Sequence, residues 1–258
     1  MGERPLALVT NDDGITSPGL ITLAEAARQA DFDVVVAAPH AEASGAGASL
    51  SVFAERGAEM FYRHEHDELA GVPCFAVHGH PAYITLAALH GAFGPRPDVV
   101  LSGINRGGNI GTSVLHSGTV GAALTAAVNE LPALAVSLDV LDREGPMYWD
   151  SVVPVLHAAF PLLYKVDAGV TLNVNVPNRP AAELGELRKA GLASFGAVHA
   201  RIASFLASRQ DLVTGVAPAP VEEGTDAELL NAGFPTVTAI NPVLESTDQP
   251  VPERLDHR

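Results

Sequence analysis

The chain has 258 residues, of which 47% are hydrophobic and 17% are charged, a composition typical of a folded protein with a sizeable core. Its formal net charge of -15 at pH 7 argues against a nucleic-acid duplex or an anionic membrane as the main partner. A single cysteine, Cys74, excludes an intrachain disulfide and a cysteine-based metal cluster, and we expect it to be a buried thiol. Because we find neither a signal peptide nor an apolar run long enough to span a membrane, we expect a cytoplasmic protein.

The first predicted strand, residues 6–10, runs directly into Asn11-Asp12-Asp13-Gly14. In open α/β sheets, ligands bind just beyond the carboxyl ends of the strands, so Asp12 and Asp13 are candidate site residues. Gly14 supplies a turn that lets the two neighbouring carboxylates converge. Two close carboxylates repel each other, and a hard divalent cation between them relieves this repulsion. The alternative is a solvated turn in which an aspartate caps the next helix.

The next segments continue as a βαβ unit, with a helix predicted over residues 17–30 and a buried strand over residues 34–38. Residues 44–49 form a loop of small residues, and the more polar segment 52–70 predicts exposed strands or a hairpin. The elements expected after it are a strand at 75–77, a helix at 81–90, a strand at 98–103 followed by a glycine-rich loop at 103–111, a loop at 116–119, an alanine-rich helix at 120–130, a strand at 133–138, a helix at 150–164 and a strand at 170–177.

The hydrophobic pattern weakens from about residue 178. Strands are predicted at 212–216 and 236–240, and Gly224-Thr225-Asp226 can cap a short helix over 227–231. The order of elements predicts one Rossmann-like, doubly wound domain over residues 1–258 with a mostly parallel sheet. We expect its core to span about 1–180, with a peripheral C-terminal part over about 181–258.

Three loops follow predicted strands and can meet at one edge of the sheet: 11–14, 39–49 and 102–119. Their oxygen-bearing side chains suit a hard cation such as Mg²⁺ or Mn²⁺. The side chains with such oxygens are Asp12, Asp13, Ser44, Asn105 and Asn109. For Ser44 the alternative is a loop hydroxyl that bonds its own backbone, and for Asn105 it is an ordinary turn residue.

The loop Ser117-Gly118-Thr119 precedes a predicted helix without early charged residues. Free N–H groups and the helix dipole form an anion site at such a position, and Gly118 lets a phosphate approach the backbone. The alternative is a plain Ser/Thr helix cap. A nucleophilic Ser117 is disfavoured because the glycine two residues earlier is missing. The first strand–helix turn also lacks Gly-x-Gly-x-x-Gly, which argues against a dinucleotide site.

These loops together resemble the SurE survival-protein family of metal-dependent 5′/3′-nucleotidases. The resemblance is collinear over nearly the whole chain, and the motifs Asn11-Asp12-Asp13-Gly14 and Ser102-Gly103-Ile104-Asn105 are specific when they occur together. Ser117-Gly118-Thr119 is a further match. It implies a Rossmann-like domain that binds one divalent metal through Asp12, Asp13, Ser44 and Asn105. It also implies that Asn11, Asn109, Ser117, Gly118 and Thr119 surround the substrate phosphate, and that the protein is a homodimer or homotetramer with exchanged C-terminal segments.

Several residues depart from the family pattern. His40 stands where an aspartate usually follows Ala-Pro, His80 and Tyr83 replace a threonine and an aspartate, and His116 replaces a tyrosine. The helix around Thr125 lacks a common acidic residue, and the region 195–224 is shorter than the usual hairpin. None of these departures removes an implied metal ligand, so they bear on substrate choice and assembly.

The sequence therefore predicts a metal-dependent phosphomonoesterase that hydrolyses nucleoside 5′- and possibly 3′-monophosphates. Asp12 or Asp13 would act either as a general base or as a nucleophile, and both roles remain open. A second hypothesis is a nucleotide-binding or regulatory protein with little catalysis. Further alternatives are a phosphatase dedicated to another small phosphate ester and a nucleotide-sugar or dinucleotide enzyme on the same fold.

Overall fold

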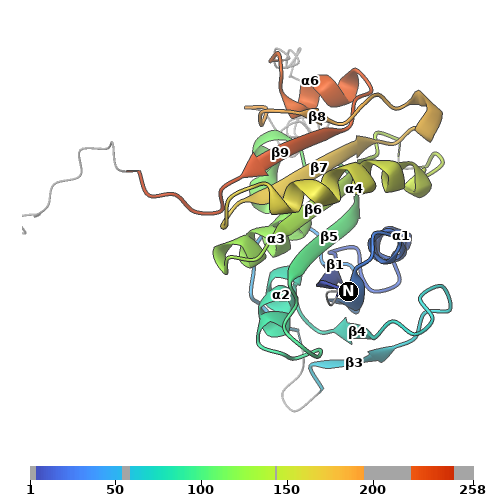
Figure 1. Cartoon of the computed structure of the whole chain (residues 1–258), viewed down its shortest axis with the longest axis vertical. Helices are drawn as coiled ribbons and strands as arrows, with labels where there is room; N and C mark the ends of the chain where they lie inside the picture. The colour runs from blue at the N-terminus through green and yellow to red at the C-terminus, as the bar shows by residue number, and fades with distance from the viewer. Residues whose placement is uncertain (1–3, 54–58, 143, 195–221, 247–258) are drawn as a thin grey trace, which may run out of the picture.

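The computed structural model describes residues 4–53, 59–142, 144–194 and 222–246. Its strands form one mixed sheet in the order β3-β4-β2-β1-β5-β6-β7-β9-β8 (Figure 1). The strands from β4 to β7 in this order are parallel to one another, whereas β3 and β9 run antiparallel to β4 and β7. The strand bounds are β1 Leu6–Thr10, β2 Asp33–Pro39, β3 Phe61–His64, β4 Cys74–Val77, β5 Val99–Arg106, β6 Ala133–Asp139, β7 Thr171–Pro177, β8 Arg188–Lys189 and β9 Thr236–Ile240.

Helices cover both faces of this sheet, as expected for a doubly wound fold. The α-helices are α1 Pro18–Gln29, α2 Pro81–Leu89, α3 Gly118–Val128, α4 Val153–Ala159 and α6 Asp226–Asn231. Four 3₁₀ segments accompany them: η1 Gly111–His116, η2 Trp149–Val152, η3 Phe160–Tyr164 and η4 Ala181–Glu183. None of the helices in the described ranges is long and apolar enough to cross a bilayer.

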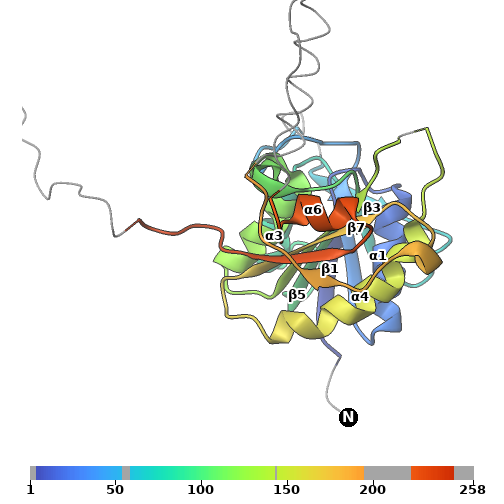
Figure 2. The ribbon, with the colours of Figure 1, turned by 90° about the horizontal axis from the view of Figure 1, so that it is seen from above.

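Two hydrophobic cores lie on the two faces because neighbouring strand residues point to opposite sides. Val9 packs in the core that contains residues of α1 and α4, whereas Leu8 packs in the core that contains residues of α2 and α3. Figure 2 shows α1 and α3 on opposite sides of the sheet. The predicted Rossmann-like architecture is thus confirmed.

The β-α-β crossover connections do not all have the same handedness. The units β1-α1-β2 and β5-α3-β6 step in opposite directions across the sheet and use opposite faces, so they share one hand. The unit β6-α4-β7 steps in the same direction as β5-α3-β6, but its helix packs in the core on the α1 face. It therefore has the opposite hand, against the strong preference for a single hand. One consequence is that η2 reaches the α1 side of the molecule.

Most predicted elements are confirmed, with three differences. In the described part of the segment 52–70 we find one short strand, β3, which pairs with β4. Strand β5 continues to Arg106 through an irregularity between Ser102 and Asn105, so Asn105 lies on a strand end and not in the expected loop. Gly103 permits this close packing, because a Cβ there would lie 2.3 Å from the Val136 carbonyl oxygen. Residues 111–116 form η1 instead of a loop.

The C-terminal elements extend the main sheet. Strand β9 pairs with β7, and α6 packs against both strands at the end of the sheet opposite β3 (Figure 1). Thr225 caps α6 as predicted, by accepting a hydrogen bond from the Glu228 backbone N–H. The strand predicted at 212–216 lies outside the described residues.

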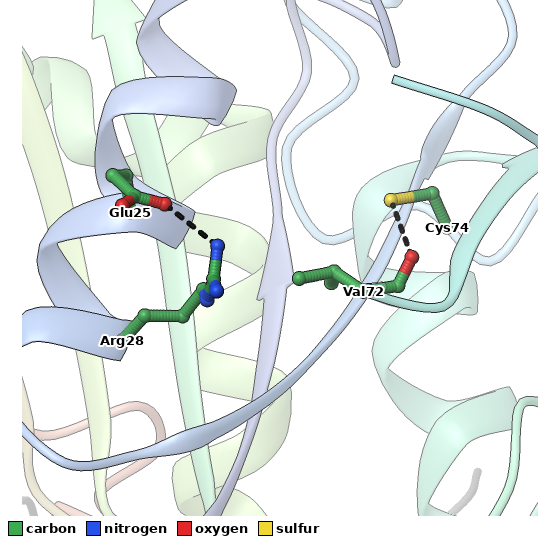
Figure 3. Close-up of polar contacts among 4 residues, drawn as sticks. All are labelled: Glu25, Arg28, Val72 and Cys74. Carbon is green, nitrogen blue, oxygen red and sulfur yellow. Dashed lines mark hydrogen bonds and ion pairs between the residues drawn. The ribbon is translucent and has the colours of Figure 1, made fainter. Parts of the chain in front are cut away.

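Cys74 is a buried thiol, as expected. Its Sγ donates a hydrogen bond of 3.4 Å to the Val72 carbonyl oxygen, and Figure 3 shows this contact near the Glu25–Arg28 ion pair of α1. Burial raises the pKa of the thiol, so Cys74 has the environment of an unreactive core residue.

Candidate active site

A cavity of about 750 Å³ opens at the carboxyl ends of β1 and β5. The chain leaves β1 toward β2 on one side and later continues at β5 on the other, so this point is where the strand order reverses. Crevices at such switch points are the usual ligand sites of open α/β sheets. Side chains from segments 12–18, 42–45, 105–109 and 113–117, together with Trp149, line the cavity. The three loops singled out in the sequence therefore do converge.

Asp12 lies at the floor of this cavity with an exposed fraction of 4%. Its Oδ1 accepts a hydrogen bond of 2.5 Å from the Thr119 hydroxyl. Burial raises the pKa of the Asp12 carboxyl, although hydrogen bonds from Thr119 and from the Gly118 backbone oppose this shift. The charged form of Asp12 is thus held in place but remains energetically unfavourable without a counter-charge.

Asp13 is the second carboxylate of the site and faces the same cavity. Its Oδ2 accepts a hydrogen bond of 3.0 Å from the Arg106 backbone N–H, which ties the end of β1 to the end of β5. Burial, the neighbouring charge of Asp12 and the Glu42 carboxylate raise the pKa of Asp13 and Arg106 opposes them, with a net pKa of about 6. The predicted repulsion between the two aspartates is therefore present in this fold.

Ser44 and Asn105 both line the cavity, as predicted. The Ser44 hydroxyl donates a hydrogen bond of 2.8 Å to the Glu42 carboxylate in an exposed loop. The Asn105 amide nitrogen donates a bond of 2.6 Å to the Gly107 carbonyl, so its Oδ1 is the atom that can accept from or coordinate a ligand. The structure thus brings one hydroxyl and one amide oxygen to the cavity that holds the two carboxylates.

Asn109 also lines the cavity and is held by a buried network of neutral groups. Its backbone N–H donates to Asn175 Oδ1 at 2.8 Å, and its side-chain nitrogen donates to the Ser137 hydroxyl at 2.8 Å. The amide nitrogens of Asn173 and Asn175 donate to its carbonyl oxygen at 2.9 and 3.0 Å. This network leaves the side-chain oxygen of Asn109 as its remaining acceptor group.

The predicted anion loop is organised differently from the expectation. Ser117 caps α3 by accepting a bond of 3.0 Å from the Val120 N–H, and it lines the cavity. Gly118 makes room for Asp12, because a Cβ there would lie 2.8 Å from Asp12 Oδ2. Thr119 is fully buried with its hydroxyl on Asp12. The start of α3 therefore holds the Asp12 carboxylate, and of the three residues only Ser117 is among those that line the cavity.

Asn11 does not line the cavity in the described structure, although the family resemblance implies a phosphate contact. It is fully buried, and its side chain closes the turn after β1. Its amide donates to the Gly14 carbonyl and its oxygen accepts from the Gly14 N–H, both at 3.1 Å. Asn11 therefore shapes the turn that carries the two aspartates.

Three residues that line the cavity, and a fourth that fixes the start of η1, were not assigned a role in the site by sequence reasoning. Glu42, Arg106 and Trp149 line the cavity. Asp226 is fully buried and accepts hydrogen bonds from the backbone N–H groups of Gly111 at 2.7 Å and Ala193 at 2.9 Å. Only Asp226 had a signal in the sequence, the Gly224-Thr225-Asp226 motif, which we interpreted as a helix cap.

The donor groups at the cavity fit a hard divalent cation. No group of three or more His, Cys, Asp or Glu side chains is placed to hold a metal within the described ranges. The oxygen-bearing side chains at the cavity include Asp12, Asp13, Ser44 and Asn105, and oxygen donors of this kind suit Mg²⁺ or Mn²⁺ better than a structural zinc ion. A cation would also relieve the charge repulsion that raises the pKa of Asp13.

Comparison with known proteins points to one family. A family model described as survival protein SurE matches residues 7–201. The 5′-nucleotidase SurE of Desulfovibrio desulfuricans is 35% identical over 90% of this chain and 91% of its own length. The 5′/3′-nucleotidase SurE of Proteus mirabilis is 40% identical over 70% of this chain and 66% of its own length.

The SurE protein of Aquifex aeolicus has a similar structure, with a TM-score of 0.70 and 26% identity, and the match covers 93% of this chain and 95% of that one. Sequence and structure therefore agree, and the chain belongs to the SurE family of survival proteins.

Proposed function

We propose that this protein is a metal-dependent nucleotidase that hydrolyses nucleoside 5′-monophosphates to nucleoside and phosphate, with nucleoside 3′-monophosphates as a second substrate class to be tested. The observation that carries the proposal is the pair Asp12 and Asp13, which face a cavity of about 750 Å³ at the switch point, with Asp12 held by the start of α3 and Asp13 by the end of β5. That volume suits a small ligand of nucleotide size. Relatives at 35% and 40% identity are named 5′-nucleotidase SurE and 5′/3′-nucleotidase SurE.

We assign the metal to Asp12, Asp13, Ser44 and Asn105, with Mg²⁺ or Mn²⁺ as the ion. A bound divalent cation polarises a phosphoryl oxygen and lowers the pKa of a bound water. Burial and the Asp12 charge raise the pKa of Asp13 to about 6, so Asp13 is a candidate to accept a proton at the cavity. Asp12 is held by Thr119 and the start of α3, which gives it a fixed orientation.

The substrate phosphate would lie between the aspartates and the segment 105–117. Ser117 and Asn109 line this space, and Arg106 contributes a positive charge to a cavity that also holds acidic side chains. The Asn109 network fixes one wall without carrying charge, so it does not add to the repulsion that a phosphate meets there.

We also infer that the chain forms a homodimer or homotetramer. After β9 the described chain continues away from the sheet over residues 241–246 (Figure 1). Val243 and Leu244 in this segment have exposed fractions of 79% and 76%. Apolar side chains on an extended arm are suited to burial against a second copy of the chain. The mass of the purified protein in solution, measured by light scattering, tests this inference.

The activity is tested by phosphate release from a panel of nucleoside 5′- and 3′-monophosphates with Mg²⁺, with Mn²⁺ and with EDTA. We expect release that depends on the metal and is lost in Asp12→Asn. Calorimetric binding of nucleotides without release under any of these conditions would contradict the proposal and favour a nucleotide-binding protein. Release that persists in EDTA would contradict the metal assignment.

A further inference from the structure

We propose that Trp149 binds the nucleobase of the substrate by stacking and thereby makes this enzyme selective for nucleotides over other phosphate esters. The inference rests on the proposed function, because it names how the same cavity recognises its substrate. Trp149 is the only tryptophan of the chain, and it lies at the cavity instead of inside either hydrophobic core.

The cavity has two chemically different ends. Asp12 and Ser117 lie on the side of α3, where the phosphate is expected. Trp149 packs against the core on the side of α1, the opposite face of the sheet, yet it lines the same cavity. A ligand that reaches from one end to the other must cross the carboxyl edge of the sheet, which suits a molecule with a phosphate at one end and a flat apolar group at the other.

The walls between these ends are polar. Among the described residues that line the cavity, Trp149 is the one large apolar side chain. A single phosphate fills only part of a cavity of about 750 Å³. A nucleobase needs a π surface as its contact, and every base can stack on an aromatic ring regardless of its hydrogen-bonding pattern. Among the described residues of this cavity, the Trp149 ring is therefore the surface on which a base would stack.

The Trp149 ring is held in place before any ligand binds. A Cβ on Gly19 would lie 2.9 Å from Cζ3 of Trp149, so the ring edge rests directly on the first turn of α1. The indole is half-buried, with one part packed on the core and another part facing the cavity. A stacking surface that is already ordered loses little conformational entropy on binding, which favours selectivity at this position.

The unusual hand of the β6-α4-β7 unit explains how the ring reaches this place. With the common hand, the connection after β6 would cover the α2 and α3 face. Instead η2 lies beside α1, and its first residue is Trp149. The position of Trp149 thus depends on this connection, whereas the positions of Asp12 and Asp13 do not.

Because Trp149 is the only tryptophan, the fluorescence of the whole protein reports on this position alone. We would titrate the Mg²⁺-loaded protein with adenosine, which carries a base but no phosphate, and with ribose as a control without a base. We expect adenosine to quench the emission in a saturable manner and ribose to leave it unchanged. Equal responses to adenosine and ribose, or no response to adenosine, would overturn the inference.

Steady-state kinetics with Trp149→Ala and Trp149→Phe separate base recognition from hydrolysis. For adenosine 5′-monophosphate, we expect Trp149→Ala to raise KM about tenfold or more and Trp149→Phe to raise it less. For ribose 5-phosphate, which has the same phosphate and sugar but no base, both variants should match the parent protein. Tyr148→Ala is the matched control, because Tyr148 precedes Trp149 but does not line this cavity in the described structure.

The failures of the two proposals are distinguishable. If no phosphate ester is hydrolysed but adenosine still quenches Trp149, the nucleotidase proposal fails and base binding stands. If both esters are hydrolysed and Trp149→Ala affects them equally, or affects neither, base stacking fails and the nucleotidase stands. Thermal unfolding of each variant checks that the substitution has not simply unfolded the protein.

Discussion

Two polar regions share the carboxyl edge of the sheet, and they are built in opposite ways. At the end of β1, Asp12 and Asp13 place two acidic groups in a partly buried site, where burial raises the pKa of both. At the ends of β6 and β7, the neutral side chains of Ser137, Asn173 and Asn175 surround Asn109 and hydrogen-bond its backbone and amide groups.

In this fold, the groups suited to bind a cation and the groups that hold the cavity wall in place are different residues. A bound cation would relieve the repulsion between the two carboxylates and so stabilise the charged region, which favours cation binding there. The neutral region is already hydrogen-bonded, so it holds the wall of the cavity in place without adding charge. Beyond this neutral network, the Asp226 carboxylate fixes Gly111, two residues after Asn109, by accepting a hydrogen bond from its backbone N–H. Substitutions in each region should therefore affect activity and stability differently.

The largest expected effect comes from Asp12→Asn, which removes a charge from the reactive region. We expect turnover to fall by about 10³-fold or more, because a metal-held transition state is stabilised by several kcal/mol. The metal-free variant should unfold at the same temperature as the parent or higher, because burial disfavours the Asp12 charge. Phosphate release and thermal unfolding measure the two effects, and full activity in the variant would contradict the metal assignment.

The neutral region should respond in the opposite way, through stability. Asn175→Ala removes the acceptor of the Asn109 backbone N–H and one of the two donors to the Asn109 carbonyl. We expect the free energy of unfolding to fall by about 2 kcal/mol, because the buried Asn109 N–H is left unpaired. Asn129→Ala is the matched control. Asn129 is exposed just after α3 and its amide donates to the Thr125 carbonyl, so its loss should cost about 0.5 kcal/mol or less.

Urea unfolding of both asparagine variants tests this prediction. Equal destabilisation by Asn175→Ala and Asn129→Ala would show that the buried network is not a special source of stability.

The stability of the charged region should depend on pH through the Asp13 carboxyl. The pKa of Asp13 is about 6 in the folded state and 3.8 in the unfolded chain, so the folded state binds this proton more tightly. Its contribution to stability is present below pH 3.8 and is lost as the pH rises through about 6. In EDTA, the stability of the parent relative to Asp13→Asn should therefore decrease between about pH 4 and pH 6.

Unfolding by urea at several pH values, with and without Mg²⁺, measures this difference. Added Mg²⁺ should stabilise the parent more above pH 6 than below it, because the ion binds the deprotonated carboxylate. A difference between parent and variant that does not change with pH would contradict the raised pKa.

The smallest expected effect is that of Ser44→Ala. Ser44 is exposed and bonds only Glu42 among the contacts that the structure describes, so stability should change by about 0.5 kcal/mol or less. If its hydroxyl also contacts the ion, the Mn²⁺ concentration that gives half-maximal activity should rise by about tenfold or less. An unchanged metal requirement would remove Ser44 from the proposed ligand set.

The site could be predicted in part because its residues follow strands. Asp12, Asp13, Ser44, Asn105 and Asn109 all come just after a buried apolar run, and parallel strands bring their carboxyl ends to one edge. Hydrophobic periodicity therefore predicted that their loops meet at this edge, whereas the choice of Ser44 as a metal ligand came from the family resemblance. The expected roles of Asn11 and Thr119 did not follow in the same way, because the direction of a side chain depends on local hydrogen bonds.

The sequence by itself determined the order of strands and helices, the two-sided core and the residues at the switch point. These follow from short-range patterns of apolar residues and turns, which act within a few residues. Only the tertiary structure decided that the start of α3 holds Asp12 and that Asp226 fixes Gly111. It also decided that the chain crosses after β6 with the uncommon hand, which brings Trp149 to the cavity. These features join segments more than 100 residues apart or depend on the choice between two faces of the sheet, and no local pattern encodes either.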